Sequence, residues 1–253
     1  MAYWRDIYRF RDSNEYEIKW AGNYGAKGEK RSRRTKATPE QVKKQNRINK
    51  TNYVRRKIKL NFEANDYWLT FTFREKQERT SAEVKGYLSK MIGKLRKEYR
   101  RAGTELKWIS RVEIGKYGGI HAHMIINRIR GETGTDLLIQ NAWEHGRVFF
   151  SLLYEEGGFK KLAEYLVKPP LEEHQDDKGL RSYSCSRNLK KPEPERKYYR
   201  RWTVKKLLEE GPVAKPGYYI DKDSIVQGEN RYTGYSYMKY TEVRLEPEGH
   251  RRI

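Results

Sequence analysis

Apolar residues recur along this chain with two different periods, and each period predicts a different kind of element. Residues 67–73, YWLTFTF, alternate in the manner of a half-buried strand. Residues 80–101 carry apolar side chains three and four positions apart behind a capping box formed by Thr80 and Glu83, which indicates a helix. Further strands are predicted at 53–61, 108–114, 120–127 and 147–154, and further helices at 39–50, 136–145, 158–168 and 203–210.

The order of these elements predicts the fold class. With the strand at 53–61 set aside, residues 67–168 read strand, helix, strand, strand, helix, strand, helix. This is the split β-α-β-β-α-β plan of ferredoxin-like and RRM-like domains, followed by one further helix. We therefore expect an α+β protein with an antiparallel sheet. Its helices should pack on one face and leave the other face open for a substrate.

Changes in the pattern divide the chain into three expected parts. Residues 1–52 should form a basic N-terminal arm with a short helix, and 22–36 in particular resemble a flexible loop. Residues 53–170 should form the core. Residues 171–253 are basic and rich in tyrosine, and this extension either packs on the core or forms a small separate unit.

Composition narrows the possible partners. The chain of 253 residues has 55 Lys plus Arg against 34 Asp plus Glu, a formal charge of +21, and this excess favours a polyanion. The 20 tyrosines and 6 tryptophans suit unpaired bases, which stack on aromatic rings. The sequence has no apolar run of 18 residues, signal peptide or lipidation motif, so we expect a cytoplasmic protein without a membrane partner. The single cysteine excludes an internal disulfide.

Two of the five histidines lie close together in the predicted strand at 120–127. His121 and His123 are two positions apart, so both imidazoles should leave the same face of the strand. A hairpin turn at 116–119 would fold Glu113 back towards them. Glu113 leaves the same face as the histidines only if the connection between the two strands has an odd number of residues or a strand contains a β-bulge. We favour the bulge. Two imidazoles and a carboxylate would leave open positions on a divalent ion that acts as a Lewis acid. Alternatively, the pair could be two outward-facing polar residues of an ordinary strand.

A metal beside a basic, aromatic surface suggests phosphodiester chemistry, and Tyr165 is the best candidate nucleophile. In the helix at 158–168, the positions of Lys161, Tyr165 and Lys168 align beside the apolar stripe. A phenol is a poor nucleophile until cations or a metal favour its phenolate form. Lys168 would orient the phosphate or offset its charge. The alternative is a surface tyrosine that covers the helix edge.

Three motifs resemble those of a known family. His121-Ala122-His123 is similar to the His-hydrophobic-His motif of the HUH endonucleases, and residues 67–73 resemble the family's first motif. Tyr165-x-x-Lys168 resembles its nucleophile motif. The resemblance is in particular to the single-tyrosine rolling-circle replication initiators of bacterial phages and plasmids, and it extends to TPEQVKKQN and RSYSCSRNLKKPEP. The sequence departs from many relatives because no His or Gln ligand directly follows the His pair and no second tyrosine lies one turn from Tyr165.

The resemblance implies a nicking and joining enzyme for single-stranded DNA at an origin hairpin in a bacterial host. It would use Mg²⁺ or Mn²⁺, held by His121, His123 and a third ligand, and form a 5′-phosphotyrosine. The chain has no Walker loop, so a host helicase and polymerase are the expected partners. The basic residues expected to contact DNA are Lys161, Arg187, Lys190, Lys191, Arg33, Arg34, Lys43 and Arg47.

Two other functions remain open at this point. A single-strand transposase or a plasmid-mobilising relaxase would use the same site chemistry. A non-catalytic RNA- or DNA-binding protein could display aromatic side chains on the same kind of sheet.

Overall fold

The computed structural model describes residues 2–22, 33–74, 79–115, 118–130, 134–154, 156–177, 179–180 and 183–245. The chain divides into two compact units. Met1–Lys44 and Pro192–Ile253 form one, here called the terminal unit, and Gln45–Lys191 form the other, the central unit. The expected arm at 1–52 and extension at 171–253 thus contribute most of their residues to a shared unit. Most of the loop expected at 22–36 lies outside the described residues.

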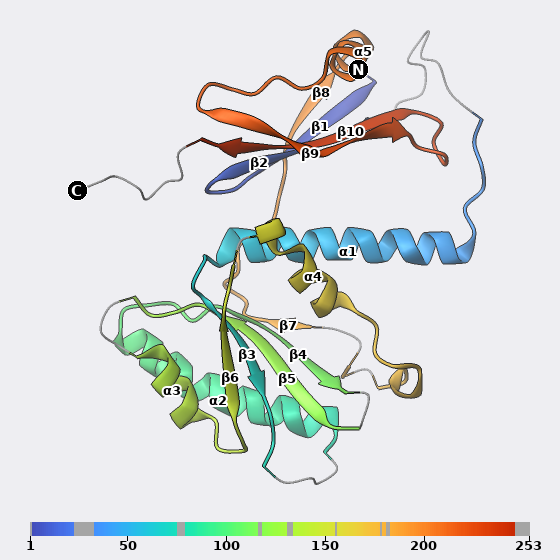
Figure 1. The fold of residues 1–253 in the computed structure, drawn as a ribbon. Coiled ribbons are helices and arrows are strands. Elements are labelled where there is room, and N and C mark those ends of the chain that lie inside the picture. The colour runs from blue at the N-terminus through green and yellow to red at the C-terminus, as the bar shows by residue number, and fades with distance from the viewer. Residues whose placement is uncertain are drawn as a thin grey trace. The chain divides into compact units, whose positions relative to one another are not determined.

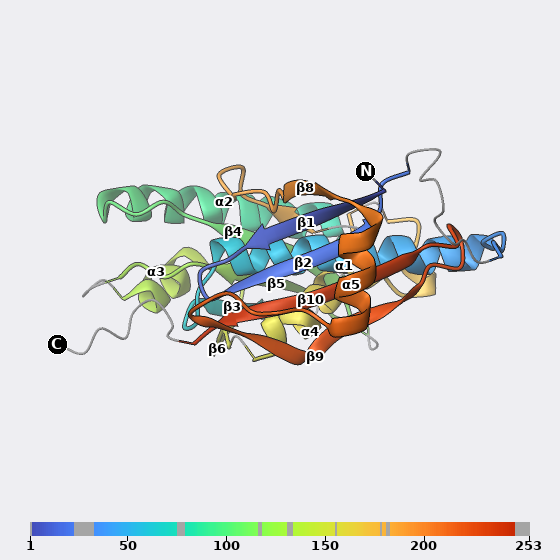
Figure 2. The same ribbon diagram turned by 90° about the horizontal axis from the view of Figure 1, so that it is seen from above.

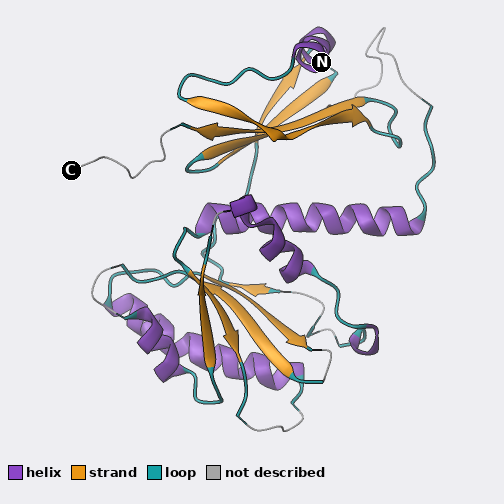
Figure 3. Cartoon of the chain, in the orientation of Figure 1, coloured by secondary structure: helices purple, strands orange, loops and turns teal. Residues whose placement is uncertain are grey.

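The described residues contain helices and two antiparallel sheets, which confirms the α+β class (Figure 3). The central sheet has the strand order β6-β3-β5-β4-β7. Its strands are β3 (Tyr67–Phe71), β4 (Trp108–Ile114), β5 (Ile120–Ile126), β6 (Val148–Leu152) and β7 (Ser184–Cys185). The central helices are α2 (Ser81–Arg101), α3 (Thr135–Ala142) and α4 (Lys160–Val167), with 3₁₀ turns at Glu156–Phe159 and Glu172–His174.

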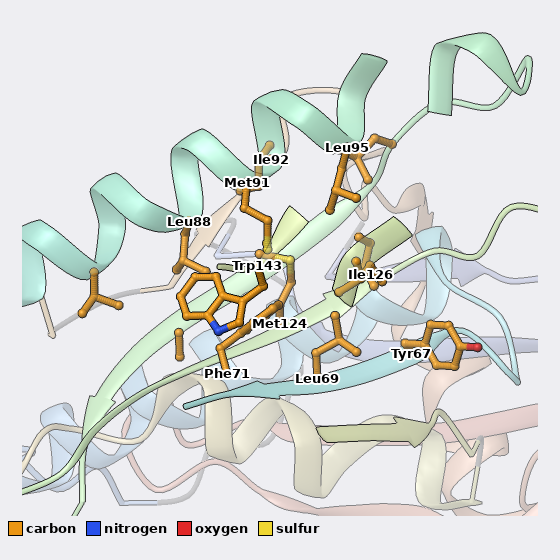
Figure 4. Close-up of a cluster of buried hydrophobic side chains, with 14 of the residues drawn as sticks. Tyr67, Leu69, Phe71, Leu88, Met91, Ile92, Leu95, Met124, Ile126 and Trp143 are labelled. Atoms are coloured by element: carbon orange, nitrogen blue, oxygen red, sulfur yellow. The ribbon is translucent and has the colours of Figure 1, made fainter. Parts of the chain in front are cut away.

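Helices cover both faces of the central sheet, so the expectation of helices on one face is wrong (Figure 1). On one face, α2 and α3 pack over β3 and β5, with Leu88, Met91 and Leu95 directed towards Leu69 and Met124 (Figure 4). On the other face, the apolar side chains of α4 and of the second half of α1 (Pro39–Asn61) form a separate cluster with the sheet. This second cluster includes Val54, Ile58, Ile109, Ile125, Ala163 and Leu166.

The prediction of a strand at 53–61 is also wrong, because these residues belong to α1. Val54, Ile58 and Phe62 are buried at intervals of four residues, which is the period of a helix that packs on one side. The capping box of α2 is confirmed: the Thr80 hydroxyl accepts a hydrogen bond from the Glu83 amide, and the Glu83 carboxylate accepts one from the Thr80 amide. No helix of the described residues has both the length and the apolar character needed to cross a bilayer.

The terminal unit is built from both ends of the chain. Its strands are β1 (Tyr3–Arg9), β2 (Ser13–Trp20), β8 (Glu195–Tyr199), β9 (Tyr218–Glu229) and β10 (Ser236–Arg244), in the order β8-β1-β2-β10-β9. Helix α5 (Arg201–Glu210) lies across one face of this sheet (Figure 2). Val204 of α5 packs there against Ile18 and Tyr240. The buried Glu242 carboxylate accepts a hydrogen bond of 2.6 Å from the Tyr16 hydroxyl.

Candidate active site

Strands β4 and β5 bring the predicted ligands onto one face of the central sheet. Glu113 lies opposite His121, and Arg111 lies opposite His123. The pairing runs without interruption from Ile114–Ile120 to Trp108–Ile126, so the predicted bulge is wrong. The connection of five residues, 115–119, is odd-numbered, and this length alone places Glu113 on the face of the histidines. Residues 116–117 of the predicted turn lie outside the described residues.

Helix α4 brings the Tyr165 hydroxyl onto this same face. Phe159, with a φ of 63°, precedes the helix, and Ala163 and Leu166 anchor it to the sheet. The Tyr165 hydroxyl donates a hydrogen bond to Glu113 Oε2 and lies 2.7 Å from His123 Nε2. Lys168 Nζ lies 3.5 Å from Glu113 Oε1. Residues expected from the sequence to act together, namely Tyr165, His123, Glu113 and Lys168, are thus in direct contact.

Arg111, which the sequence analysis did not single out, holds the end of α4 against the sheet. Its guanidinium Nη1 donates hydrogen bonds to the carbonyls of Tyr165, at 3.1 Å, and Leu166, at 2.8 Å. The last carbonyls of a helix have no partner within the helix and carry partial negative charge, so a cation there is stabilising. Burial lowers the pKa of Arg111, while the charges of Glu113 and Tyr165 oppose this shift. Arg111 therefore positions the backbone that carries Tyr165.

Two residues of β3 fix the ring of His123. Thr70 Oγ1 lies 3.0 Å from His123 Nδ1, and the indole of Trp68 stacks on the imidazole with centroids 5.3 Å apart. With Nδ1 bonded to Thr70, Nε2 is directed at the Tyr165 hydroxyl. Alternation along YWLTFTF could have suggested both residues, because positions 68 and 70 leave the same face of one strand. The sequence did not show that this face is the one that bears His123.

The electrostatics of the site favour the neutral forms of His123 and Tyr165. Burial lowers the pKa of His123 to about 4, so its imidazole is neutral near pH 7 and can accept a proton or bind a cation. Burial, and next the hydrogen bond to Glu113, raise the pKa of Tyr165 above its ordinary value. The sequence predicted that cations or a metal would favour the phenolate. Among the described residues, burial and the Glu113 carboxylate outweigh the charge of Arg111, so attack by Tyr165 requires a group that takes its proton.

Glu113, His121 and His123 offer carboxylate and imidazole donors, which are types that divalent ions bind. Glu113 Oε2 and His123 Nε2 lie 4.0 Å apart. An ion such as Mg²⁺ lies about 2.1 Å from each ligand, so two donors at this separation can reach one ion. The His121 ring lies beside the turn, where a Cβ added to Gly115 or Gly119 would be 3.5 Å from its Nε2. Its Nδ1 is buried without a hydrogen-bond partner among the described residues.

In the part of the chain that the structure describes, no three His, Cys, Asp or Glu side chains converge on one point. Glu113 and His123 converge, and His121 leaves the same face two residues before His123 in β5. The donor types and their shared face are those that a divalent ion uses, and among the described residues Glu113 and His123 are the pair that comes close enough to share one.

The other predicted DNA-binding residues make none of these contacts. Lys161 is exposed on α4, and Arg187, Lys190 and Lys191 are exposed in the segment that follows β7. Arg47 is exposed on α1 within the central unit. Arg33, Arg34 and Lys43 belong to the terminal unit and are also exposed.

This arrangement defines an α+β domain with a tyrosine, a histidine and a carboxylate joined on one face of an antiparallel sheet. Residues 66–170 match the model of the replication-associated protein ORF2 family, a family of phage replication initiators. The matched segment covers less than half of the chain and contains every residue that contacts Tyr165 or His123 in the site described above. No curated protein and no solved structure matches the chain.

Proposed function

We propose that this protein is a rolling-circle replication initiator that nicks and rejoins single-stranded DNA through Tyr165. The family match over residues 66–170 supports the role in phage replication. The observation that carries the chemistry is the contact of the Tyr165 hydroxyl with both Glu113 and His123. A nucleophile bonded to a carboxylate and a neutral imidazole is the arrangement that acid–base assistance requires.

In the proposed reaction, the Tyr165 oxygen forms a bond to phosphorus while the bond from phosphorus to the 3′ oxygen breaks. The phenol proton passes to Glu113, which already accepts its hydrogen bond. The 3′ oxygen keeps the electron pair of the broken bond and takes a proton from solvent. The products are a 5′-phosphotyrosine and a free 3′ hydroxyl. The reverse attack by a 3′ hydroxyl rejoins the strand and returns the phenol.

Mg²⁺ or Mn²⁺ would be held by Glu113, His121 and His123. When bound, such an ion would stabilise negative charge on a non-bridging phosphate oxygen. Lys168 lies beside the same carboxylate and would orient the phosphate through its charge. An origin hairpin is the proposed substrate, with strand separation and synthesis left to a host helicase and polymerase.

The direct test is to find the residue that becomes attached to DNA. The full chain is incubated with Mn²⁺ and single-stranded oligonucleotides that tile the parent replicon, and the DNA-linked peptide is sequenced by mass spectrometry. We expect the link at Tyr165, and we expect Tyr165→Phe to bind DNA without forming the adduct. Tyr154→Phe is the matched control, because Tyr154 is close in sequence and 69% exposed. An adduct that persists in Tyr165→Phe would refute the assignment.

The same experiment separates the other functions that the sequence left open. Cleavage at one origin supports an initiator, whereas cleavage at paired element ends would indicate a transposase, and cleavage at a transfer origin a relaxase. If none of the oligonucleotides is cleaved, a non-catalytic nucleic-acid-binding protein is favoured.

A further inference from the structure

A pocket of about 920 Å³ lies within the central unit at the edge of its sheet. It is formed by the C-terminal half of α2, the loop at 103–106, the start of β4 and residues 185–188. Trp108 leaves β4 on the face that packs on α2, because it alternates with Arg111 and Glu113. Cys185, which also lines the pocket, packs against the cluster on the other face, so the pocket lies at the edge of the sheet rather than over one face. Its volume is in the range of sites that hold small ligands.

Three arginines give this pocket its charge. Arg96 and Arg100 are one turn apart on α2, and Arg187 approaches from the segment after β7. Among the described residues, none of these three guanidinium groups has an ion pair with a carboxylate. The one acidic residue of the lining, Glu105, lies 3.5 Å from the side-chain nitrogen of Asn188. The lining therefore carries an uncompensated excess of two positive charges.

The walls of the pocket add aromatic surface and neutral hydrogen-bonding groups. The indole of Trp108 lines it, and the indole nitrogen has no acceptor among the described residues although the atom is buried. The opposite wall is held in place by Asn188, which donates to the carbonyl of Leu106 at 3.2 Å. This contact ties the segment that bears Arg187 to the loop before β4.

We propose that this pocket binds a segment of single-stranded DNA, with Arg96, Arg100 and Arg187 on its phosphates and Trp108 beside a base. Guanidinium groups without carboxylate partners match phosphate oxygens in charge and geometry. An aromatic wall suits an unpaired base, which a duplex would keep inside its stack. The pocket would thus be a second DNA contact, at the sheet edge and lined by none of the residues that contact Tyr165. Its binding does not require cleavage by Tyr165.

The test is the salt dependence of DNA binding by the full chain. Affinity for a fluorescently labelled oligothymidine is measured without divalent cations over a range of NaCl concentrations. Each phosphate contact on a single strand contributes about 0.7 to the slope of log affinity against log salt. The triple variant Arg96→Gln, Arg100→Gln and Arg187→Gln should therefore lower the magnitude of this slope by about 2. Each single substitution should lower it by about 0.7.

The matched control removes the same number of positive charges from α2, at positions outside the pocket. Lys85→Gln, Lys90→Gln and Lys97→Gln together take away three cations of α2 that do not line the pocket. Thermal melting checks that both triple variants remain folded. A smaller change of slope in the control than in the pocket variant supports DNA binding in the pocket. Equal changes in the two triple variants, or an unchanged slope in the pocket variant, would overturn this proposal.

Two further measurements distinguish this proposal from the proposed nicking function and from binding of duplex DNA. Tyr165→Phe should retain the full salt slope, so loss of nicking and loss of the pocket contact are independent results. A labelled duplex of the same length tests the preference for unpaired DNA. If the arginine substitutions weaken binding of the duplex and spare the oligothymidine, the assignment to single-stranded DNA is wrong.

Discussion

Thr70 controls which nitrogen of His123 is offered to the rest of the site. Its hydroxyl lies 3.0 Å from Nδ1, and Nε2 then faces Tyr165. Groups that hold the second nitrogen of a metal-binding histidine typically account for 10–100-fold in metal affinity. We therefore expect Thr70→Val to raise the Mn²⁺ concentration that gives half-maximal cleavage by about 10–100-fold. The maximal rate at saturating Mn²⁺ should change less.

Thr70→Ser provides the control, because it keeps the hydroxyl and should restore the Mn²⁺ requirement of the wild type. A merely structural role predicts a different result. In that case Thr70→Val would lower the melting temperature and the maximal rate while the Mn²⁺ dependence remained unchanged.

Phe149 offers an aromatic surface in line with Thr70 and His123. It pairs with Thr70 across β3 and β6, and Thr70 pairs with His123 across β3 and β5, so the three side chains form one row on one face. Phe149 is 56% exposed. Stacking of a base on such a ring contributes about 1–3 kcal/mol. We expect Phe149→Ala to weaken binding of the cleavable oligonucleotide by about ten-fold or more.

Leu137→Ala is the matched control for Phe149, since Leu137 of α3 is similarly exposed, at 60%, and belongs to a helix on the other face of the sheet. Fluorescence anisotropy with the uncleaved oligonucleotide measures both variants. Equal affinities for Phe149→Ala and Leu137→Ala would contradict a role of Phe149 in binding.

At the scale of elements, α2 begins at a capping box whose contribution can be measured. Thr80 satisfies the Glu83 amide, which has no acceptor within the helix. Replacing a threonine cap by alanine typically costs about 1 kcal/mol. Thr80→Ala should therefore lower the free energy of unfolding by about 1 kcal/mol in urea titrations followed by circular dichroism. Ser89→Ala, an exposed substitution within the same helix, should not destabilise the protein. Comparable losses of unfolding free energy in Thr80→Ala and Ser89→Ala would contradict a stabilising role of the Thr80 cap.

Elements whose determinants are local were predictable from the sequence. The α2 capping box, the His-x-His strand and the apolar stripe beside Tyr165 are all contained within a single element, and each was found. The segment at 53–61 was wrongly predicted to be a strand because its β-branched and aromatic residues favour strands. In the structure it packs on the sheet as a helix. Tertiary packing of this kind overrides local propensity.

The same limit applies to β1 and β2, which were not predicted. Strand β2 pairs with β10, whose residues lie more than 200 positions later in the sequence, so no local pattern predicts this sheet. The candidate site shows the same difference between local sequence features and contacts that only the fold creates. His123 and Tyr165 stand out as residue types, but the roles of Thr70 and Arg111 depend on pairing across strands and on the end of α4.

At the scale of the whole molecule, the many tyrosines make stability sensitive to alkaline pH. Burial raises the pKa of Tyr183 and of Tyr240 to about 12, and it also raises the pKa of Tyr16 and Tyr99. Above the ordinary tyrosine pKa of about 10, the unfolded chain releases these protons while the folded chain keeps them. The folded state then binds more protons than the unfolded state, so stability must fall as pH rises. Both units contain such residues.

Tyr240 allows this linkage to be isolated, because it is 6% exposed and stacks on Tyr16 within the terminal sheet, with centroids 4.5 Å apart. Between about pH 10 and pH 12, each such tyrosine lowers the free energy of unfolding by up to about 1.4 kcal/mol per pH unit. Tyr240→Phe should make the decline shallower by up to this amount in urea titrations at several pH values. Tyr219→Phe is the control, because that side chain is 48% exposed, and it should leave the slope unchanged. If Tyr240→Phe declined as steeply as the wild type, burial of this phenol would not be the cause of the alkaline instability.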